Sequence, residues 1–191
     1  MQKKQLRKKT SRIRNSIPAS EKKKLDANIE KNLLEWEVYK KAGCIFCFVS
    51  FRSEVNTRGI IRHSLQTGKQ VCVPKIDLNS GEMKAVVITD TEKDLTPGAY
   101  GIKGPADYCK EADYASLDLI IAPGLCFSPD GYRLGYGGGF YDRFLRQNQN
   151  PVTCAPTYDR LIFNALPVDE NDLPVDYLIT ESGIKSTRRN I

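Results

Sequence analysis

Three short and mostly apolar runs constrain the fold of this 191-residue chain more than any other feature. They span residues 44–49, 70–73 and 117–122, and the first of them is continuously apolar. Strands that are buried on both faces have this pattern, which is typical of parallel sheets covered by helices. Between the first two runs, residues 57–67 carry apolar side chains at helical spacing. The sequence therefore predicts a βαβ unit and an α/β fold.

Weaker patterns complete the predicted order of elements. Further strands are expected at residues 83–89, 153–157 and 177–180, and further helices at residues 1–16, 20–36 and 139–147. Ser20 is the predicted cap of the second helix. Residues 90–116 predict an ordered surface loop, and the tail after residue 182 is expected to be loose. The alternation predicts one three-layer domain over residues 1–191, with a mainly parallel sheet and helices on both faces.

The composition is that of a globular protein that needs no covalent staples, because 40% of its residues are hydrophobic. No run reaches the ~18 to 20 apolar residues of a membrane-spanning helix, and no secretory segment begins the chain, so a soluble cytoplasmic protein is expected. Only Cys44 and Cys47 of the six cysteines have C-x-x-C spacing, and His63 is the single histidine. Buried reduced thiols are therefore favoured over a zinc site, and catalysis by a Ser-His-Asp or Cys-His arrangement is disfavoured.

The net charge of +6 is concentrated at the N-terminus. Residues 1–24 hold ten Lys or Arg against Glu21 alone, whereas the remaining chain holds 19 basic and 22 acidic residues. A local anion site is one interpretation, and a solvated basic helix is another. A mitochondrial transit peptide is a third, which fits least well because Lys outnumbers Arg and apolar residues are few.

Residues 131–144 form the segment with the clearest chemistry. Four glycines fall within residues 135–139, between Arg133 and the start of a predicted helix. Glycines let backbone amides approach phosphate oxygens closely, and the positive end of a helix dipole favours an anion. A Walker A loop and the dinucleotide fingerprint both fail here, the latter because Phe140 stands where the third glycine is needed. The segment predicts a phosphate-binding loop, with a flexible surface loop as the less favoured alternative.

This segment resembles a known family signature. Residues 123–125 together with residues 133–142 are similar to the signature of the 5-formyltetrahydrofolate cyclo-ligase family. Three weaker pieces agree in order, namely the basic residues 3–7, the segment 53–57 and the acidic segment 166–176. The resemblance covers essentially the whole chain.

The resemblance implies an enzyme that converts 5-formyltetrahydrofolate and ATP to 5,10-methenyltetrahydrofolate, ADP and phosphate, with Mg²⁺. It assigns ATP binding to the N-terminal helix and the glycine-rich segment through Lys3, Lys4, Arg7, Arg133, Leu134, Gly135, Tyr136, Gly137, Gly138, Gly139, Phe140 and Tyr141. It assigns folate binding to Val49, Glu54, Tyr136, Gly137, Gly138, Gly139 and Phe140. Arg133 and Tyr141 are the expected catalytic residues, and Asp142 and Asp172 are the expected magnesium ligands.

The residue chemistry supports two of these assignments and leaves alternatives. Asp142 after a phosphate loop suits a hard cation, but a carboxylate in the first turn of a helix is also favoured by the dipole alone. Glu54 suits the N–H donors of a pterin edge, or is a solvated loop residue. Gly104, Leu161 and Asn171 depart from residues that are frequent in the family, which leaves the contacts on the folate side open.

Two other functions remain possible on the sequence. A nucleic-acid-binding protein would use the basic N-terminus for phosphates and tyrosines for stacking, but Tyr132, Tyr136 and Tyr141 cluster in the glycine-rich segment instead. A folate-binding relative without activity would keep the fold alone. The expected partners are small-molecule substrates, with no nucleic acid and no membrane, and a monomer is expected.

Overall fold

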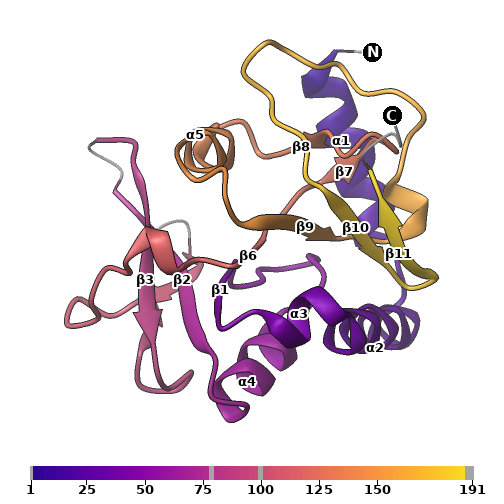
Figure 1. Ribbon diagram of the computed structural model, residues 1–191. Helices are drawn as coiled ribbons and strands as arrows, with labels where there is room; N and C mark the ends of the chain where they lie inside the picture. The colour runs from indigo at the N-terminus through magenta and orange to yellow at the C-terminus, as the bar shows by residue number, and fades with distance from the viewer. Residues whose placement is uncertain (1, 78–79, 99–100, 188–191) are drawn as a thin grey trace.

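Seven strands form one central sheet in the computed structural model, which describes residues 2–77, 80–98 and 101–187. The order across the sheet is β11-β10-β9-β6-β1-β2-β3 (Figure 1). These strands are β1 (Cys44–Cys47), β2 (Gln70–Ile76), β3 (Met83–Ile88), β6 (Leu119–Ile121), β9 (Val152–Pro156), β10 (Tyr177–Thr180) and β11 (Gly183–Ser186). The helices are α1 (Lys3–Asn15), α2 (Ala19–Glu35), α3 (Glu37–Lys41), α4 (Arg58–Gln66) and α5 (Phe140–Gln147).

The five central strands are parallel, and the two edge strands are antiparallel to their neighbours. Ile45 of β1 pairs with Val71 of β2 on one side and Leu119 of β6 on the other. The predicted mainly parallel sheet is therefore confirmed. The expectation of a loose tail after residue 182 is wrong for residues 183–187, because β11 pairs with the whole of β10. Residues 188–191 lie outside the described part of the chain.

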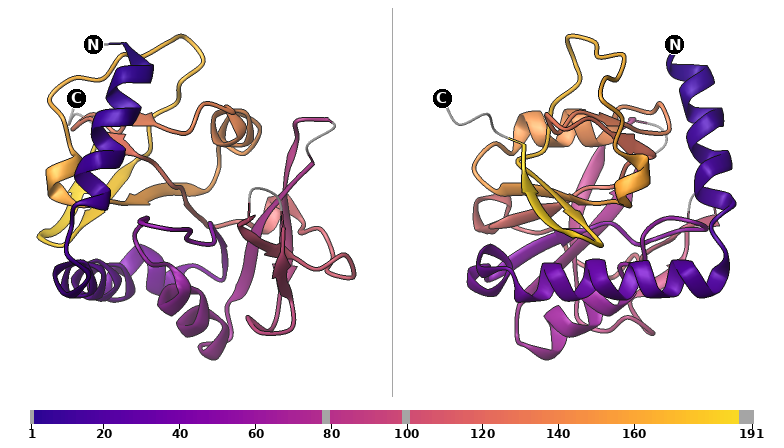
Figure 2. Two further views of the ribbon diagram at one scale, coloured as in Figure 1. Left: turned by 180° about the vertical axis from the view of Figure 1, so that it is seen from behind. Right: turned by 90° about the vertical axis from the view of Figure 1, so that its right-hand side faces the viewer.

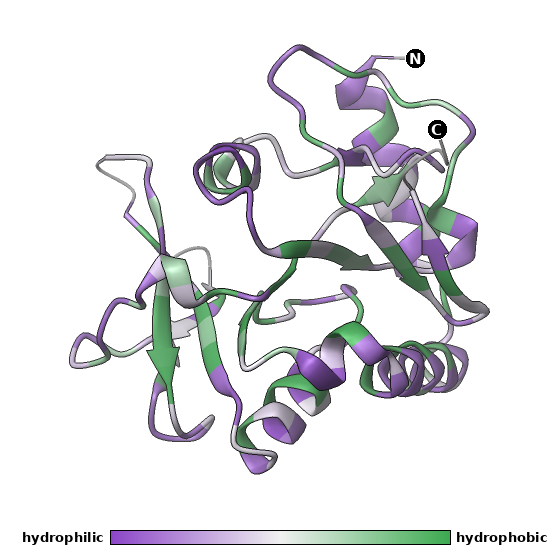
Figure 3. Cartoon of the chain, in the orientation of Figure 1, coloured by the Kyte–Doolittle hydropathy of each residue, from purple (hydrophilic) through white to green (hydrophobic). Residues whose placement is uncertain are grey.

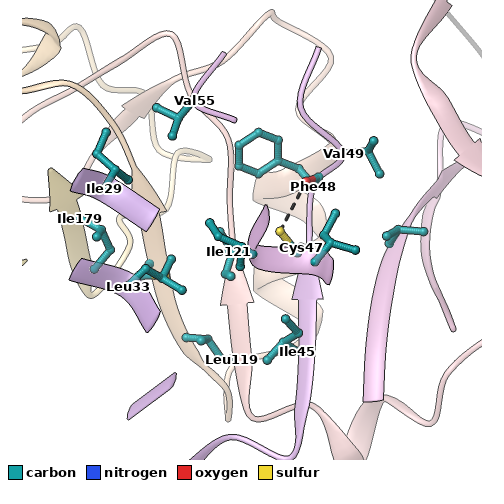
Figure 4. Close-up of a cluster of buried hydrophobic side chains, with 14 of the residues drawn as sticks. Ile29, Leu33, Ile45, Cys47, Phe48, Val49, Val55, Leu119, Ile121 and Ile179 are labelled. Carbon is teal, nitrogen blue, oxygen red and sulfur yellow. Dashed lines mark hydrogen bonds between the residues drawn. The ribbon is translucent and has the colours of Figure 1, made fainter. Parts of the chain in front are cut away.

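Alternate residues of β1 point to opposite layers, as the pleat of a strand requires. Ile45 and Cys47 belong to a core cluster that includes residues of α2 and α4 (Figure 4). Cys44 and Phe46 belong to a second cluster, which includes Phe144 of α5. Figure 3 shows the strands mostly hydrophobic and the outer faces of the helices mostly hydrophilic. Helices thus cover both faces of the sheet, and the predicted three-layer arrangement is confirmed.

The structure contains two small hairpins that the sequence does not predict, and one helix begins at a different residue than expected. The predicted loop of residues 90–116 contains a hairpin of β4 (Leu95–Pro97) and β5 (Lys103–Pro105). A second hairpin, β7 (Cys126–Phe127) and β8 (Arg133–Leu134), follows β6. The cap predicted at Ser20 is wrong, because α2 already begins at Ala19 and Pro18 occupies the cap position with φ −59°. None of the described helices is both long and apolar enough to cross a membrane.

Candidate functional site

The glycine-rich segment connects β8 to the start of α5. The predicted order of strand, glycine-rich loop and helix is present. However, the short β7–β8 hairpin lies between β6 and the loop. Gly137 has φ +111°, and a Cβ atom there would lie 3.4 Å from Nη2 of Arg7. This position therefore needs glycine for its backbone conformation, whereas a Cβ atom would only come into contact with the Arg7 side chain.

Helix α1 runs beside this loop (Figure 2), and its basic side chains contact the loop and the acidic segment. Nε of Arg7 donates a hydrogen bond to the carbonyl of Gly135 at 2.8 Å. Nζ of Lys3, one turn earlier on the same face, contacts Asp169 and Asp172, each at 2.6 Å. Lys4 is exposed on an adjacent face. Two of the three basic residues predicted on this helix thus lie at the loop or at the acidic segment.

Arg133 points into the protein rather than out from the loop. Its side chain is only 3% exposed. Its guanidinium donates to the carbonyl of Leu173 at 2.6 Å and to Oδ1 of Asp142 at 2.8 Å. Burial lowers the pKa of Arg133, and the charge of Asp142 opposes that shift. The guanidinium of Arg133 thus binds Asp142 and the C-terminal segment. Its predicted contact with a phosphate would use the remaining N–H donors.

The two predicted magnesium ligands are connected through one residue. The N–H of Leu173, which directly follows Asp172 in the chain, donates to Oδ1 of Asp142 at 3.2 Å. Partial burial disfavours ionisation of Asp172, but Lys3 holds the pKa of this carboxyl below its ordinary value. Within the described ranges, no group of three or more His, Cys, Asp or Glu side chains could hold a metal. A cation at these two carboxylates would therefore take its other ligands from a substrate or water.

On the folate side of the predicted site, Glu54 is buried and held at both oxygens. Oε1 accepts a hydrogen bond from the hydroxyl of Tyr136 at 3.0 Å, and Oε2 accepts one from the N–H of Phe51 at 2.9 Å. Burial raises the pKa of this carboxyl. The alternative of a solvated loop residue is thus wrong for Glu54. Val49, which follows β1, is also buried.

Comparison with known proteins identifies the family to which a chain with this site belongs. A family model described as the 5-formyltetrahydrofolate cyclo-ligase family matches residues 1–181 of the chain. The chain belongs to this family. A 5-formyltetrahydrofolate cyclo-ligase of Mus musculus is 32% identical, with 87% of each chain covered. One from Escherichia coli K12 is 26% identical, with 90% of this chain and 96% of the relative covered.

Solved structures of similar proteins agree with this cyclo-ligase fold. The 5,10-methenyltetrahydrofolate synthetase of Aquifex aeolicus has a TM-score of 0.88 and 29% identity, covering 100% of this chain and 95% of that chain. The synthetase of Mycoplasma pneumoniae, at 22% identity, has a TM-score of 0.76 over 95% of this chain and 99% of that chain, which supports the fold alone. The family and the fold class predicted from the sequence are therefore confirmed.

The remaining residues predicted from the cyclo-ligase signature fall into different environments. Leu134 is buried in the core, so only its backbone is available to a nucleotide. Phe140 packs partly on the second core cluster, and the guanidinium of Arg143 lies over its ring at 5.1 Å. The hydroxyl of Tyr141 is buried and has no hydrogen-bond partner among the described residues. An unpaired buried donor is costly, so this hydroxyl is a candidate for a ligand contact.

The three departures from the family pattern have separate surroundings. Gly104 lies in β5, with open space where a Cβ atom would be. Leu161 is buried in the core. Oδ1 of Asn171 accepts a hydrogen bond from Arg146 at 3.2 Å, beside Asp172.

One buried polar residue of the site had not been predicted. Arg14 is 5% exposed and reaches Tyr136 and Ser53 from the last turn of α1. A sequence signal for it exists, because Lys3, Arg7 and Arg14 are separated by four and seven residues and thus share one helix face. Charge alone could not distinguish this arginine from the exposed Arg12.

Proposed function

We propose that this chain catalyses the ATP-dependent cyclisation of 5-formyltetrahydrofolate to 5,10-methenyltetrahydrofolate, with release of ADP and phosphate. The observation that carries the proposal is the family match over residues 1–181. Two structural observations support the same chemistry. Arg7 contacts the glycine-rich loop, and Glu54 is buried. The substrates are small molecules, and we propose a monomeric cytoplasmic enzyme.

The reaction requires activation of a poor leaving group. In the proposed sequence, the formyl oxygen attacks the γ-phosphorus of ATP, so that a new P–O bond forms while the bond to ADP breaks. The neighbouring folate nitrogen then attacks the formyl carbon and loses its proton, and the C–O bond to phosphate breaks. Such a transfer depends on positioning and neutralised charge more than on a protein nucleophile. A site without a catalytic histidine or reactive cysteine is consistent with that requirement.

The residue roles follow from the contacts described above. We propose that Lys3, Lys4 and Arg7 neutralise charge on ATP, while backbone groups of residues 134–141 surround its phosphates. Arg133 would contact the transferred group with its free donors and hold Asp142 with the others. Glu54 would accept hydrogen bonds from the pterin, with Val49 packing beside it.

The donor set at Asp142 and Asp172 fits Mg²⁺. Magnesium is commonly held by one or two carboxylates, with phosphate oxygens and water completing its coordination. The link through Leu173 keeps the two aspartates together. Each carboxylate also pairs with a cationic side chain, Asp142 with Arg133 and Asp172 with Lys3, which supports the proposal. When bound, Mg²⁺ would neutralise charge on the ATP phosphates during transfer.

The proposal is tested with purified protein, ATP, Mg²⁺ and 5-formyltetrahydrofolate, by following the absorbance of the methenyl product. Product should form, and omission of ATP should abolish it. Calorimetric titration of ATP with and without Mg²⁺ gives a separate measure of the metal, and tighter binding with Mg²⁺ is expected. Cyclisation at the same rate without ATP would contradict the mechanism. Equal ATP affinity in both titrations would contradict the metal site.

A further inference from the structure

Arg14 joins three segments of the site that are distant in sequence. Its Nε donates to Oγ of Ser53 at 3.0 Å, and its Nη2 donates to the hydroxyl of Tyr136 at 2.7 Å. Nη1 lies 3.5 Å from the carbonyl of Gly124. The guanidinium carbon is 6.0 Å from the centre of the Tyr136 ring. One buried side chain thus contacts the loop before α4, the turn after β6 and the glycine-rich segment.

The hydroxyl of Tyr136 connects Arg14 to Glu54 by two hydrogen bonds. It accepts a hydrogen bond from Arg14 and donates one to Oε1 of Glu54, at 2.7 and 3.0 Å respectively. Ser53, next to Glu54, also donates to Oδ1 of Asn15 at 2.6 Å. The end of α1 therefore holds the Glu54 segment at two points. Removal of the guanidinium would leave the Tyr136 hydroxyl with Glu54 alone and Ser53 with Asn15 alone.

Burial and nearby charge act in opposite directions on the ionisation of Glu54. A buried carboxylate is unfavourable unless charges or donors compensate for its lost hydration. Burial raises the pKa of Glu54, whereas the N–H of Phe51, the Tyr136 hydroxyl and the positive charges of Arg14 and Lys22 oppose that rise. Burial raises the pKa of Tyr141, and the charge of Glu54 adds to that rise. The charges of Arg14 and Lys22 thus favour the ionised form of Glu54.

We infer that Arg14 is a positioning residue for the folate substrate, which acts through Tyr136 and Ser53 to hold Glu54 oriented and ionised. This inference rests on the proposed function. Different turns of helix α1 would then act on the two substrates. Lys3 and Arg7 would contact the nucleotide, and Arg14 would position the residues that bind the folate. Loss of Arg14 should weaken folate binding and spare ATP, whereas loss of Arg7 should do the reverse.

The test compares Arg14→Met with Arg12→Met, which removes an exposed arginine from the same last turn of α1. Binding of 5-formyltetrahydrofolate is measured by calorimetry without ATP, and KM is measured for each substrate. Because the lost hydrogen bonds involve a charged group, Arg14→Met should weaken folate binding about tenfold or more. The KM for ATP should stay within about twofold, and Arg12→Met should change neither quantity.

The pH dependence of folate binding separates positioning of Glu54 from a general packing defect. Binding requires ionised Glu54, so it is lost as the pH falls through the pKa of that carboxyl. Without the Arg14 charge this pKa rises further, and the loss of binding should begin at a higher pH than in the unchanged protein. Arg14→Lys keeps the charge but not the fork, so it should restore the pH profile and only part of the affinity.

Tyr136→Phe provides the second variant, because it removes only the hydroxyl that connects Arg14 to Glu54. It should weaken folate binding in the same way, and the double variant should cost less than the sum of the two changes. If Arg14→Met fails to fold, weaker folate binding by Tyr136→Phe, with the same upward pH shift, supports the inference. Unchanged folate affinity in either folded variant, or equal losses for ATP and folate, would overturn it. Absence of methenyl product from the unchanged protein would instead contradict the proposed function, while folate binding still tests Arg14.

Discussion

At the scale of single residues, the ion pair of Arg133 and Asp142 joins a buried structural contact to a proposed magnesium ligand. Arg133 is almost fully buried, whereas the Asp142 side chain is 24% exposed and its Oδ1 accepts from both Arg133 and Leu173. The carboxylate therefore compensates a buried charge and remains accessible to a cation. A substitution at Asp142 should affect both stability and metal use.

We predict that Asp142→Asn loses most turnover and requires more Mg²⁺. It should also lower the free energy of unfolding by about 1.5 to 3 kcal/mol, because the Arg133 guanidinium loses its charged partner. Asp172→Asn is the matched variant, since its partner Lys3 is 23% exposed, against 3% for Arg133, and loss of this pair should cost about 1 kcal/mol or less. Turnover against Mg²⁺ concentration and urea unfolding measure the two effects. Unchanged turnover and magnesium dependence in Asp142→Asn would leave only the structural role.

The residues of the site could be predicted from the sequence more easily than their orientations. The glycine-rich segment identified Arg133 and Asp142 as neighbours of a loop. It did not indicate that Arg133 turns inward, because that depends on the backbone carbonyl of Leu173, 40 residues away. The role of Arg14 could not be predicted for a similar reason. Its partners Ser53 and Tyr136 are distant in sequence and become its neighbours only in the folded chain.

At the scale of elements, α1 is a basic helix whose faces differ in their contacts. Arg7 contacts the glycine-rich loop, whereas Arg12 is exposed. Arg7→Met should therefore raise the KM for ATP about fivefold or more, while Arg12→Met should change it less than twofold. Steady-state rates at several ATP concentrations provide the measurement. Equal effects of the two substitutions would mean that α1 acts only through its total charge.

The β7–β8 turn is the second element whose geometry makes a clear prediction. Gly131 has φ +83°, and a Cβ atom there would lie only 2.2 Å from the carbonyl oxygen of Val175. Gly131→Ala should therefore lower the free energy of unfolding by at least about 1 to 3 kcal/mol, from backbone strain alone. At Gly104 a Cβ atom meets nothing within 4 Å, so Gly104→Ala should stay within about 0.5 kcal/mol. Urea unfolding of both variants tests this, and equal stabilities would contradict the geometry of the turn.

At the scale of the whole molecule, the sequence predicted the centre of the sheet better than its margins. Strands β1, β2 and β6 are buried on both faces, so their apolar runs identified them. Strand β11 is mostly exposed and pairs on one side only, which leaves no apolar pattern. The hairpins β4–β5 and β7–β8 are too short for periodicity to reveal, because each strand has only two or three residues.

The proposed reaction depends on activation of the formyl oxygen by phosphorylation. The most direct measurement uses 5-formyltetrahydrofolate labelled with ¹⁸O in the formyl group, together with ATP and Mg²⁺. The methenyl product is followed by absorbance, and the released phosphate is analysed by mass spectrometry. One ¹⁸O atom is expected in each phosphate released, because the formyl oxygen leaves bonded to phosphorus. Methenyl product accompanied by unlabelled phosphate, or no methenyl product at all, would contradict the proposed reaction.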